Sequence, residues 1–235
     1  KNANKKADRQ PETSPAGEGG RGLLVVLGAA ESGIGAALLA KQKGYEVFVS
    51  DGGIIKQNYK QELIDNNIEF EEGRHNEEKI LQADEVMKSP GIPAKNTLVK
   101  KIRAAGIPVI SEIELAYRFK GDSTIIAITG SNGKSTVTSL IYHICKTAEL
   151  DCALVGNIGY SFAKQVAEDP KPLYVAEISS FQLDDIHDFR PDLALLLNIT
   201  EDHLDMYEYK FENYIRSKFK IIQNQQAGDY FIYCA

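Results

Sequence analysis

Short apolar runs alternate with longer amphipathic or polar segments along most of the chain, from residue 23 onward. Apolar runs of this length predict β-strands buried on both faces, and the segments between them show helical spacing. Such alternation is typical of parallel sheets covered by helices. The first half predicts strands at 23–27, 46–51, 68–70, 85–88 and 108–110, with helices at 36–43, 56–66 and 95–105. The second half predicts strands at 124–129, 152–155, 173–178 and 193–199, with helices at 135–147 and 161–167.

The chain divides near residues 119–123, where the polar segment FKGDS separates two apolar strands. We therefore expect an α/β fold with two parallel-sheet domains, at 22–121 and 122–235. Residues 1–21 hold almost no large apolar side chain, so burial cannot offset their ordering entropy, and we expect a disordered tail. The last apolar run, 229–235, is followed by no closing helix, which favours an incomplete second domain.

Composition weighs against several classes of function. The chain of 235 residues has a net charge of -6, whereas nucleic-acid and anionic-membrane binding rely on surplus Lys and Arg. Its three cysteines are too few and too scattered for a disulfide framework or a CxxC site. No apolar run approaches the roughly 20 residues that span a bilayer. We expect a cytoplasmic monomer that binds neither nucleic acid nor membrane.

The segment TIIAITGSNGKST, residues 124–136, places a buried strand, a loop of small residues and a helix start in succession. In this order, backbone N–H groups and the helix dipole converge on phosphate oxygens. The usual GxxxxGK pattern would need a glycine where this chain has Ile128, and the alternative is a glycine turn with an incidental lysine. We predict a nucleotide site at Gly130, Ser131, Asn132, Gly133, Lys134, Ser135 and Thr136, with Lys134 at the β- and γ-phosphates and the last two hydroxyls suited to Mg²⁺.

Two downstream residues have side chains whose positions call for a chemical explanation. Glu177 ends a strand expected to be buried on both faces, where an unpaired carboxylate is costly unless a cation balances it. The alternatives are a salt bridge or a carboxylate that reaches water. His203 lies in the acidic segment TEDHLD, where a neutral imidazole could hold a metal or simply form a hydrogen bond within the loop.

Lys218 interrupts the apolar stripe of a predicted helix. The stripe comprises residues 211, 214, 215, 219 and 222, and Lys218 takes the missing i+7 position, while Ser217 falls on the solvent side. The lysine therefore points inward. It then either snorkels to the surface, pairs with a carboxylate or is chemically modified.

The segment TGSNGKST resembles the ATP loop of the Mur ligases and of the related folylpolyglutamate synthases. Four more segments strengthen the resemblance, and these are SPGIP at 89–93, GNIG at 156–159, EISSFQL at 177–183 and NITEDHLDMY at 198–207. Together they are more similar to the D-glutamate-adding ligases than to the L-alanine- or diaminopimelate-adding ones. The chain departs from that pattern at Met206, where arginine is more common.

The resemblance implies a Rossmann-like domain at 22–121 that binds UDP-N-acetylmuramoyl-L-alanine, and a P-loop domain at 122–235 that binds ATP. The implied reaction adds D-glutamate through an acyl phosphate, with Lys134, His203 and Lys218 as the catalytic residues. It uses two Mg²⁺ ions, one held by Ser135, Thr136 and Glu177, the other by His203 and Lys218. In the family, the lysine fifteen residues after this histidine, as Lys218 is after His203, is carbamylated by CO₂.

The resemblance also assigns the UDP group to the first domain, near the glycine loop GAAESGIG and the end of the next strand. Ser-Pro-Gly is equally common as a plain turn. The implied UDP residues are Glu31, Ser32, Asp51, Ser89, Pro90 and Gly91, and those implied for the muramoyl-alanyl end are Asn157, Gln182 and His203.

Other functions stay open at this point. A nucleotide-dependent switch would use the phosphate loop but leaves Glu177 and Lys218 unexplained. An NAD-dependent oxidoreductase would rest on the first glycine loop, where Ala30 replaces the middle glycine of GxGxxG. A different Mur ligase or a folylpolyglutamate-synthase-like enzyme would differ in the amino acid added, which these residues do not fix.

Overall fold

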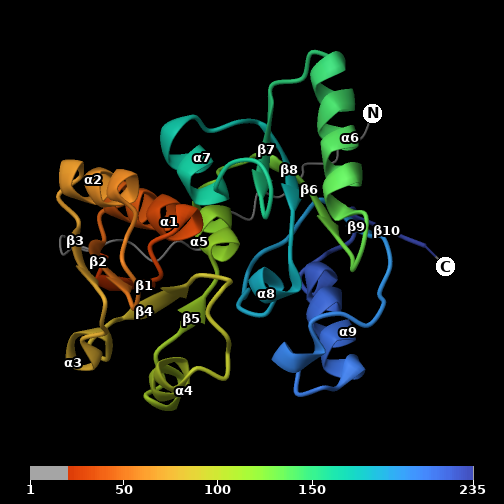
Figure 1. The fold of residues 1–235 in the computed structure, drawn as a ribbon. Helices are drawn as coiled ribbons and strands as arrows, with labels where there is room; N and C mark the ends of the chain where they lie inside the picture. Colours follow the sequence, from red (N-terminus) through yellow and green to blue (C-terminus); the bar gives the residue numbers. More distant parts are fainter. Residues whose placement is uncertain (1–20, 235) are drawn as a thin grey trace, which may run out of the picture.

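The computed structural model describes residues 21–234, which form two five-stranded parallel sheets (Figure 1). The predicted tail lies outside the described residues as far as residue 20. Within residues 21–234, no helix combines the length and apolar character needed to cross a bilayer. The strand order is β3-β2-β1-β4-β5 in the first sheet and β10-β9-β6-β8-β7 in the second, which confirms the predicted pair of parallel sheets.

The first domain has the five predicted strands and three predicted helices, together with two helices that the sequence analysis did not predict. Its strands are β1 (Leu23–Leu27), β2 (Glu46–Asp51), β3 (Glu69–Glu72), β4 (Glu85–Lys88) and β5 (Val109–Ile110). Its helices are α1 (Glu31–Gln42), α2 (Gln57–Asp65) and α4 (Thr97–Ala104), as predicted, with α3 (Glu77–Ile80) and α5 (Glu112–Phe119) in addition.

The second sheet begins after α5, at the polar turn that the sequence marks. Its strands are β6 (Thr124–Thr129), β7 (Cys152–Gly156), β8 (Leu173–Glu177), β9 (Leu193–Leu196) and β10 (Tyr230–Tyr233). Its helices are α6 (Lys134–Thr147), α7 (Phe162–Glu168), α8 (Ser180–Leu183) and α9 (Phe211–Phe219), with short 3₁₀ turns at Leu204–Met206 and Lys220–Ile222.

Helix α1 starts at Glu31, five residues before the predicted start at 36. The glycines that favoured a turn lie inside the helix. These positions are glycine because neighbouring atoms leave no room for a side chain. A Cβ on Gly33 would lie 1.9 Å from the carbonyl oxygen of Gly28, and one on Gly35 would lie 2.0 Å from Oγ of Ser161. These glycines therefore serve close packing, and the predicted helix start was wrong.

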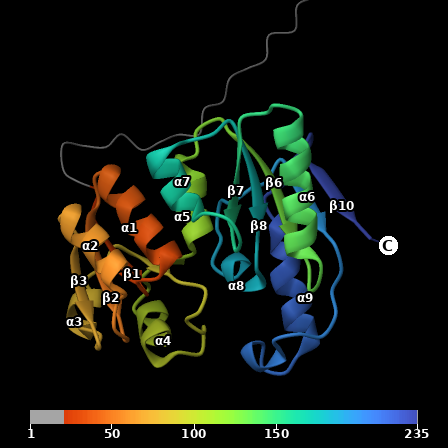
Figure 2. The ribbon, with the colours of Figure 1, turned by 45° about the horizontal axis from the view of Figure 1, so that its top comes forward.

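Each strand of the second sheet sends alternate side chains to opposite faces, as strand geometry requires. In β6, Ile126 and Ile128 pack with α6, while Ile125 and Ala127 join the core on the other side. Figures 1 and 2 show α6 on one side of this sheet and α5 and α7 on the other. The sheet is thus covered on both faces, which explains its continuous apolar strands.

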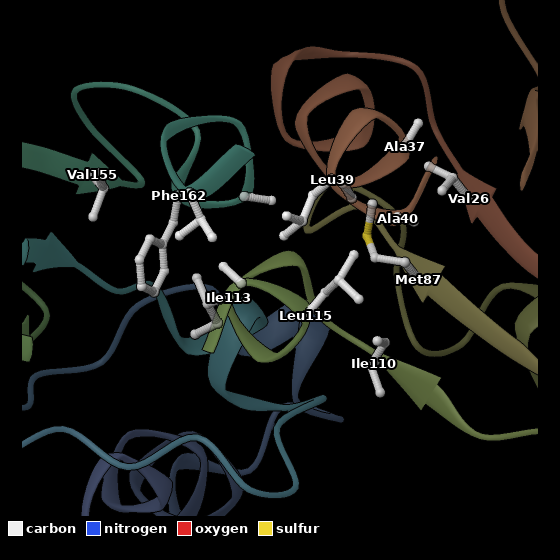
Figure 3. Close-up of a cluster of buried hydrophobic side chains, with 14 of the residues drawn as sticks. Val26, Ala37, Leu39, Ala40, Met87, Ile110, Ile113, Leu115, Val155 and Phe162 are labelled. Atoms are coloured by element: carbon white, nitrogen blue, oxygen red, sulfur yellow. The ribbon is translucent and has the colours of Figure 1, made fainter. Parts of the chain in front are cut away.

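The two sheets share one apolar core, built by α1, α5 and α7. Figure 3 shows Ile113 and Leu115 of α5 between Met87 and Ile110 of the first sheet and Phe162 of α7. All five side chains are fully buried. Since this core continues from one sheet to the other, helix packing fixes the orientation of the two sheets.

A buried carboxyl group lies within this junction. Glu112, at the start of α5, is 2% exposed and accepts hydrogen bonds from Oγ of Ser161 at 2.7 Å and the backbone N–H of Ala163 at 2.6 Å. Burial raises the pKa of Glu112 from 4.5 to about 7, against the lowering effect of these hydrogen bonds. Glu112 thus joins the start of α5 to the start of α7 within the buried junction.

Candidate nucleotide and substrate sites

The phosphate loop, residues 130–136, connects β6 to α6 at the carboxyl end of the second sheet. Gly133 precedes the helix in the left-handed conformation, with φ of 82°, which a side chain would disfavour. Ser135 and Thr136 are exposed in the first turn of α6. The loop thus leaves backbone N–H groups and two hydroxyls open to a phosphate and its cation.

A second loop, residues 198–200, holds the phosphate loop from the side. Asn132 N–H donates to Oδ1 of Asn198 at 2.9 Å, and Nδ2 of Asn198 returns a bond to the Asn132 carbonyl at 3.0 Å. The hydroxyl of Ser131 donates to the Thr200 carbonyl at 3.0 Å and accepts from the Thr200 N–H at 2.9 Å. These reciprocal pairs hold the phosphate loop in one conformation.

Lys218 lies at the same loop with its ammonium fully buried. It is 1% exposed, and Nζ donates to the carbonyl of Gly130 at 2.8 Å and lies 4.5 Å from the ring centre of Tyr214. Burial, and then the positive charge of Lys134, lower the pKa of Lys218 to about 8. Within residues 21–234 this ammonium forms no ion pair, so neither snorkelling nor a carboxylate partner describes it.

Glu177 ends β8 at 1% exposure, as its strand context predicts. Its Oε1 accepts from Nδ2 of Asn157 at 2.6 Å, while Oε2 is buried without a hydrogen-bond partner among the described residues. The sequence analysis left a salt bridge or a water-exposed carboxylate as alternatives for Glu177. Both are wrong, because the side chain is buried and its partner among the described residues is the amide of Asn157. An orphaned carboxylate oxygen is costly, and a divalent cation with hard oxygen ligands would satisfy it.

His203 lies on the rim of the same edge, in the left-handed region with φ of 51°. Its side chain is 53% exposed and its ring packs against Phe181 at 5.2 Å. Across residues 21–234 no three His, Cys, Asp or Glu side chains come close enough to hold a metal ion. The two-metal ligand set therefore stays a prediction.

A separate pocket of about 260 Å³ opens at the carboxyl end of the first sheet. Asp51 ends β2 there, and its two oxygens accept from the backbone N–H groups of Ala29 at 2.7 Å and Gly53 at 2.8 Å. The pocket lies at the edge where open α/β sheets bind ligands. Its walls are Leu27, Gly28, Asp51, Gly52, Gly53, His75, Ile92, Asn96 and Leu98.

Two family models match most of the described chain. One, described as the MurD N-terminal domain, matches residues 22–98, and the other, the Mur ligase middle domain, matches residues 128–235. The chain belongs to the Mur ligase family. Residues 99–127, between the two matched ranges, include helix α5 at the junction of the two sheets.

Curated Mur ligases resemble the chain over almost all of its length. It is 58% identical over 210 residues to the UDP-N-acetylmuramoylalanine--D-glutamate ligase of Bacteroides fragilis and 57% identical to that of Bacteroides thetaiotaomicron. The matches cover 89% of this chain and 47% of each relative. The chain thus spans about half the length of the curated relatives that it matches.

Solved Mur ligase structures share the fold at low sequence identity. The UDP-N-acetylmuramate:L-alanyl-gamma-D-glutamyl-meso-diaminopimelate ligase of Neisseria meningitides aligns with a TM-score of 0.61 and 19% identity, covering 90% of this chain and 71% of that one. The UDP-N-acetylmuramate-alanine ligase of Thermotoga maritima gives a TM-score of 0.56 and 19% identity, covering 90% and 48%. These likenesses support the two-sheet fold.

The structure distributes the residues expected to bind the Mur substrate over several places. Of the predicted UDP residues only Asp51 lines the first pocket. Glu31 accepts from the Ser161 N–H at 3.2 Å, near the start of α7, and Ser89 is buried with its hydroxyl on the Gly28 carbonyl at 3.4 Å. The remaining three lie outside that pocket, with Ser32 and Pro90 half-buried and Gly91 exposed.

The residues expected at the muramoyl-alanyl end have structural partners of their own. Asn157 bonds to Glu177, and the Gln182 carbonyl oxygen accepts from the N–H of Ser179 as part of the cap of α8. His203 is exposed, and its Nε2 lies 3.5 Å from Oδ2 of Asp202. Sequence analysis also missed His75 and Asn96, because both reach the pocket from irregular loops that carry no motif.

Proposed function

We propose that this chain provides the UDP-substrate site and the ATP site of a ligase that adds D-glutamate to UDP-N-acetylmuramoyl-L-alanine for peptidoglycan synthesis. The names of its relatives supply the substrates. The observation that carries the proposal is Lys218, an unpaired and buried lysine that touches the phosphate loop. A nucleotide switch leaves this lysine unexplained, and Ala30 and the phosphate loop count against an NAD-dependent oxidoreductase.

The proposed reaction has two steps at the substrate carboxylate. A carboxylate oxygen attacks the γ-phosphorus of ATP, the bond to the β-phosphate bridging oxygen breaks, and ADP leaves an acyl phosphate. The D-glutamate amine then attacks the acyl carbon, the amine loses a proton and inorganic phosphate departs. The chain contributes position and charge, because Lys134 and the N-terminal N–H groups of α6 offset the charge of the moving phosphoryl group.

Magnesium fits the oxygen-rich side of this edge. Glu177, with its orphaned Oε2, and the exposed hydroxyls of Ser135 and Thr136 would hold one ion, while His203 and a carbamylated Lys218 would hold a second. Bound Mg²⁺ would neutralise phosphate charge during transfer.

Lys218 has the properties that carbamylation requires. Its lowered pKa of about 8 raises the neutral fraction at physiological pH, and only a neutral amine attacks CO₂. The Nζ lone pair forms a bond to the CO₂ carbon and the nitrogen releases a proton to solvent. The product exchanges a costly buried cation for an anion that a metal ion can balance.

The decisive test measures phosphate release by the full-length gene product, because the curated relatives are about twice as long as this chain. Each assay combines ATP and one muramoyl precursor with D-glutamate, L-alanine or diaminopimelate. We expect turnover only with UDP-N-acetylmuramoyl-L-alanine and D-glutamate. Turnover with another pair would assign the chain to a different Mur ligase. We further infer a cytoplasmic location, on account of the soluble substrates and three free cysteines, and the monomeric state stays a prediction.

A further inference from the structure

Lys88 and Asp185 form a buried ion pair between the two domains. Nζ of Lys88, the last residue of β4, lies 3.1 Å from Oδ2 of Asp185, which follows α8 by two residues. Both side chains are 4% exposed, so the pair is removed from water. The sequence analysis assigned a role to neither residue.

The first domain holds Asp185 at three points. Besides the contact with Lys88, Oδ1 accepts from the Arg103 guanidinium of α4 at 2.5 Å, and the Asp185 carbonyl accepts from the Ser111 N–H at 2.8 Å. Oδ2 accepts no hydrogen bond from any residue that the structure describes, so its charge faces the Lys88 ammonium. Asp185 is therefore fixed relative to the first sheet although it belongs to the second domain.

Lys88 also closes the turn that follows β4, residues 89–93. Its Nζ donates to the Ile92 carbonyl at 3.0 Å, and the Ile92 N–H donates to the Ser89 carbonyl at 3.1 Å. The Ser89 N–H in turn donates to the Leu27 carbonyl at the end of β1, at 3.0 Å. Ile92 lies in the wall of the pocket of the first sheet. A continuous series of contacts thus runs from Asp185 through Lys88 to a wall of that pocket.

Fold stability alone is a weak reason for this pair. A buried ion pair loses the hydration of both ions, and well-packed apolar replacements of both partners are often equally stable. An apolar pair would supply no donor to the Ile92 carbonyl. The ammonium is therefore needed for the turn, and the carboxylate is needed to keep the ammonium charged and oriented in a buried position.

We propose that Lys88 and Asp185 are positioning residues of the substrate pocket. Asp185 orients the Lys88 ammonium, and Lys88 holds Ile92 at the pocket wall. The inference rests on the proposed function, which brings the UDP precursor to this pocket. Neither residue of the pair lines the pocket, so both act through the turn. Substrate affinity of the first domain then depends on an acid of the second domain.

The test measures steady-state kinetics of three variants of the full-length gene product. Lys88→Met removes the donor and keeps an unbranched side chain, so the KM for UDP-N-acetylmuramoyl-L-alanine should rise about tenfold. The kcat and the KM for ATP should change less than about twofold, because no reacting group is altered. Lys101→Met is the matched control, since it breaks an exposed ion pair of the same domain, with Glu77 at 2.5 Å.

The double variant Lys88→Met with Asp185→Asn separates positioning from stability. Lys88→Met alone leaves an unbalanced carboxylate oxygen in the interior, so its melting temperature should fall. The double variant removes both charges at nearly constant volume and should melt closer to the wild type. Its KM for the muramoyl precursor should stay high, because the Ile92 carbonyl still lacks its donor.

A double variant with the melting temperature and the KM of the wild type overturns the positioning role and leaves the proposed function standing. The positioning role also fails if kcat falls in Lys88→Met while the KM for the precursor does not change. If the wild-type enzyme does not turn over this precursor with D-glutamate, the proposed function fails, and the positioning role fails with it.

Discussion

Lys134 and Lys218 donate hydrogen bonds to the same carbonyl oxygen, that of Gly130, at 2.9 and 2.8 Å. Two ammonium groups on one acceptor repel each other, and this repulsion adds to burial in lowering the pKa of Lys218. The repulsion between the two ammonium groups is therefore relieved when Lys134 turns to a phosphate or when Lys218 loses its charge. Both changes belong to the proposed reaction.

Lys218→Ala in the full-length enzyme should lower turnover by about 100-fold or more, since it removes the ligand proposed for the second metal. The fold should persist because alanine favours helix. Acetate or formate should restore part of the rate by replacing the carbamate, and removal of CO₂ from the wild type should lower its rate reversibly. Lys210→Ala, with a side chain 63% exposed beside the same helix, is the control. Near wild-type turnover in Lys218→Ala would exclude the carbamate.

Lys134→Ala should reduce turnover by about 1,000-fold, because no other side chain of the loop supplies a charge to the phosphates. Affinity for the UDP precursor should stay within about twofold, since the pocket proposed for it lies on the other sheet. Calorimetric titration with the precursor checks this, with Lys146→Ala in the last turn of α6 as control. A large loss of precursor affinity would show that the two ligands are not held by separate domains.

Asp51→Ala should weaken the UDP precursor about tenfold or more and leave ATP binding unchanged. The substitution frees the N–H groups of Ala29 and Gly53, so the glycine loop loses the acceptor that shapes it. The control is Asp65→Ala, an exposed acid at the end of α2. Tight binding of NAD(H) instead of the UDP precursor would replace the ligase with an oxidoreductase.

Glu112→Gln should remove a pH dependence of stability. The pKa of Glu112 rises from 4.5 to about 7 on folding, so the folded state holds an extra proton between these values. Below pH 4.5 Glu112 is protonated in both states and does not change the stability of the wild type. As the pH rises through 7, ionisation of Glu112 lowers the free energy of unfolding by up to about 3 kcal/mol, mainly because the carboxylate is buried and partly because Glu31 repels it. Glutamine keeps the acceptor without this loss. Urea unfolding at pH 5 and pH 8 measures the free energy of unfolding of the wild type and of Glu112→Gln, with exposed Glu78→Gln as control. A free-energy difference between wild type and Glu112→Gln that is the same at both pH values would contradict the assignment.

Patterning alone predicted the parallel strands and the inward direction of Lys218, because both follow from periodicity. It misplaced Ser217, which is 2% exposed instead of solvated because its hydroxyl donates to the Ser180 carbonyl at 2.9 Å. The prediction for Phe219 was wrong in the opposite direction, because this residue was assigned to the buried stripe and is 42% exposed. A helical stripe gives an average direction, and single neighbours decide the residues at its margins.

Positions in the fold were predictable where a motif joins a residue to a strand end, as for Lys134, Glu177 and Asp51. Contacts between distant segments were not. The bond from Asn157 to Glu177 and the use of Gln182 in a helix cap depend on tertiary neighbours, and so does the placement of His75 beside Ser50. The roles proposed for Asn157, Glu177 and Gln182 in metal and substrate binding remain predictions.

The helix layer of α1, α5 and α7 holds the two sheets of the proposed ligase at a set separation. It packs both sheets without an intervening flexible segment, and a single methyl group at Gly35 would already strike Ser161. The separation between the pocket of the first sheet and the phosphate loop is then a fixed length. If one end of the proposed substrate binds in the pocket of the first sheet, its other end has to span this separation to reach the phosphate loop, so the two-sheet frame would limit which substrate lengths can react.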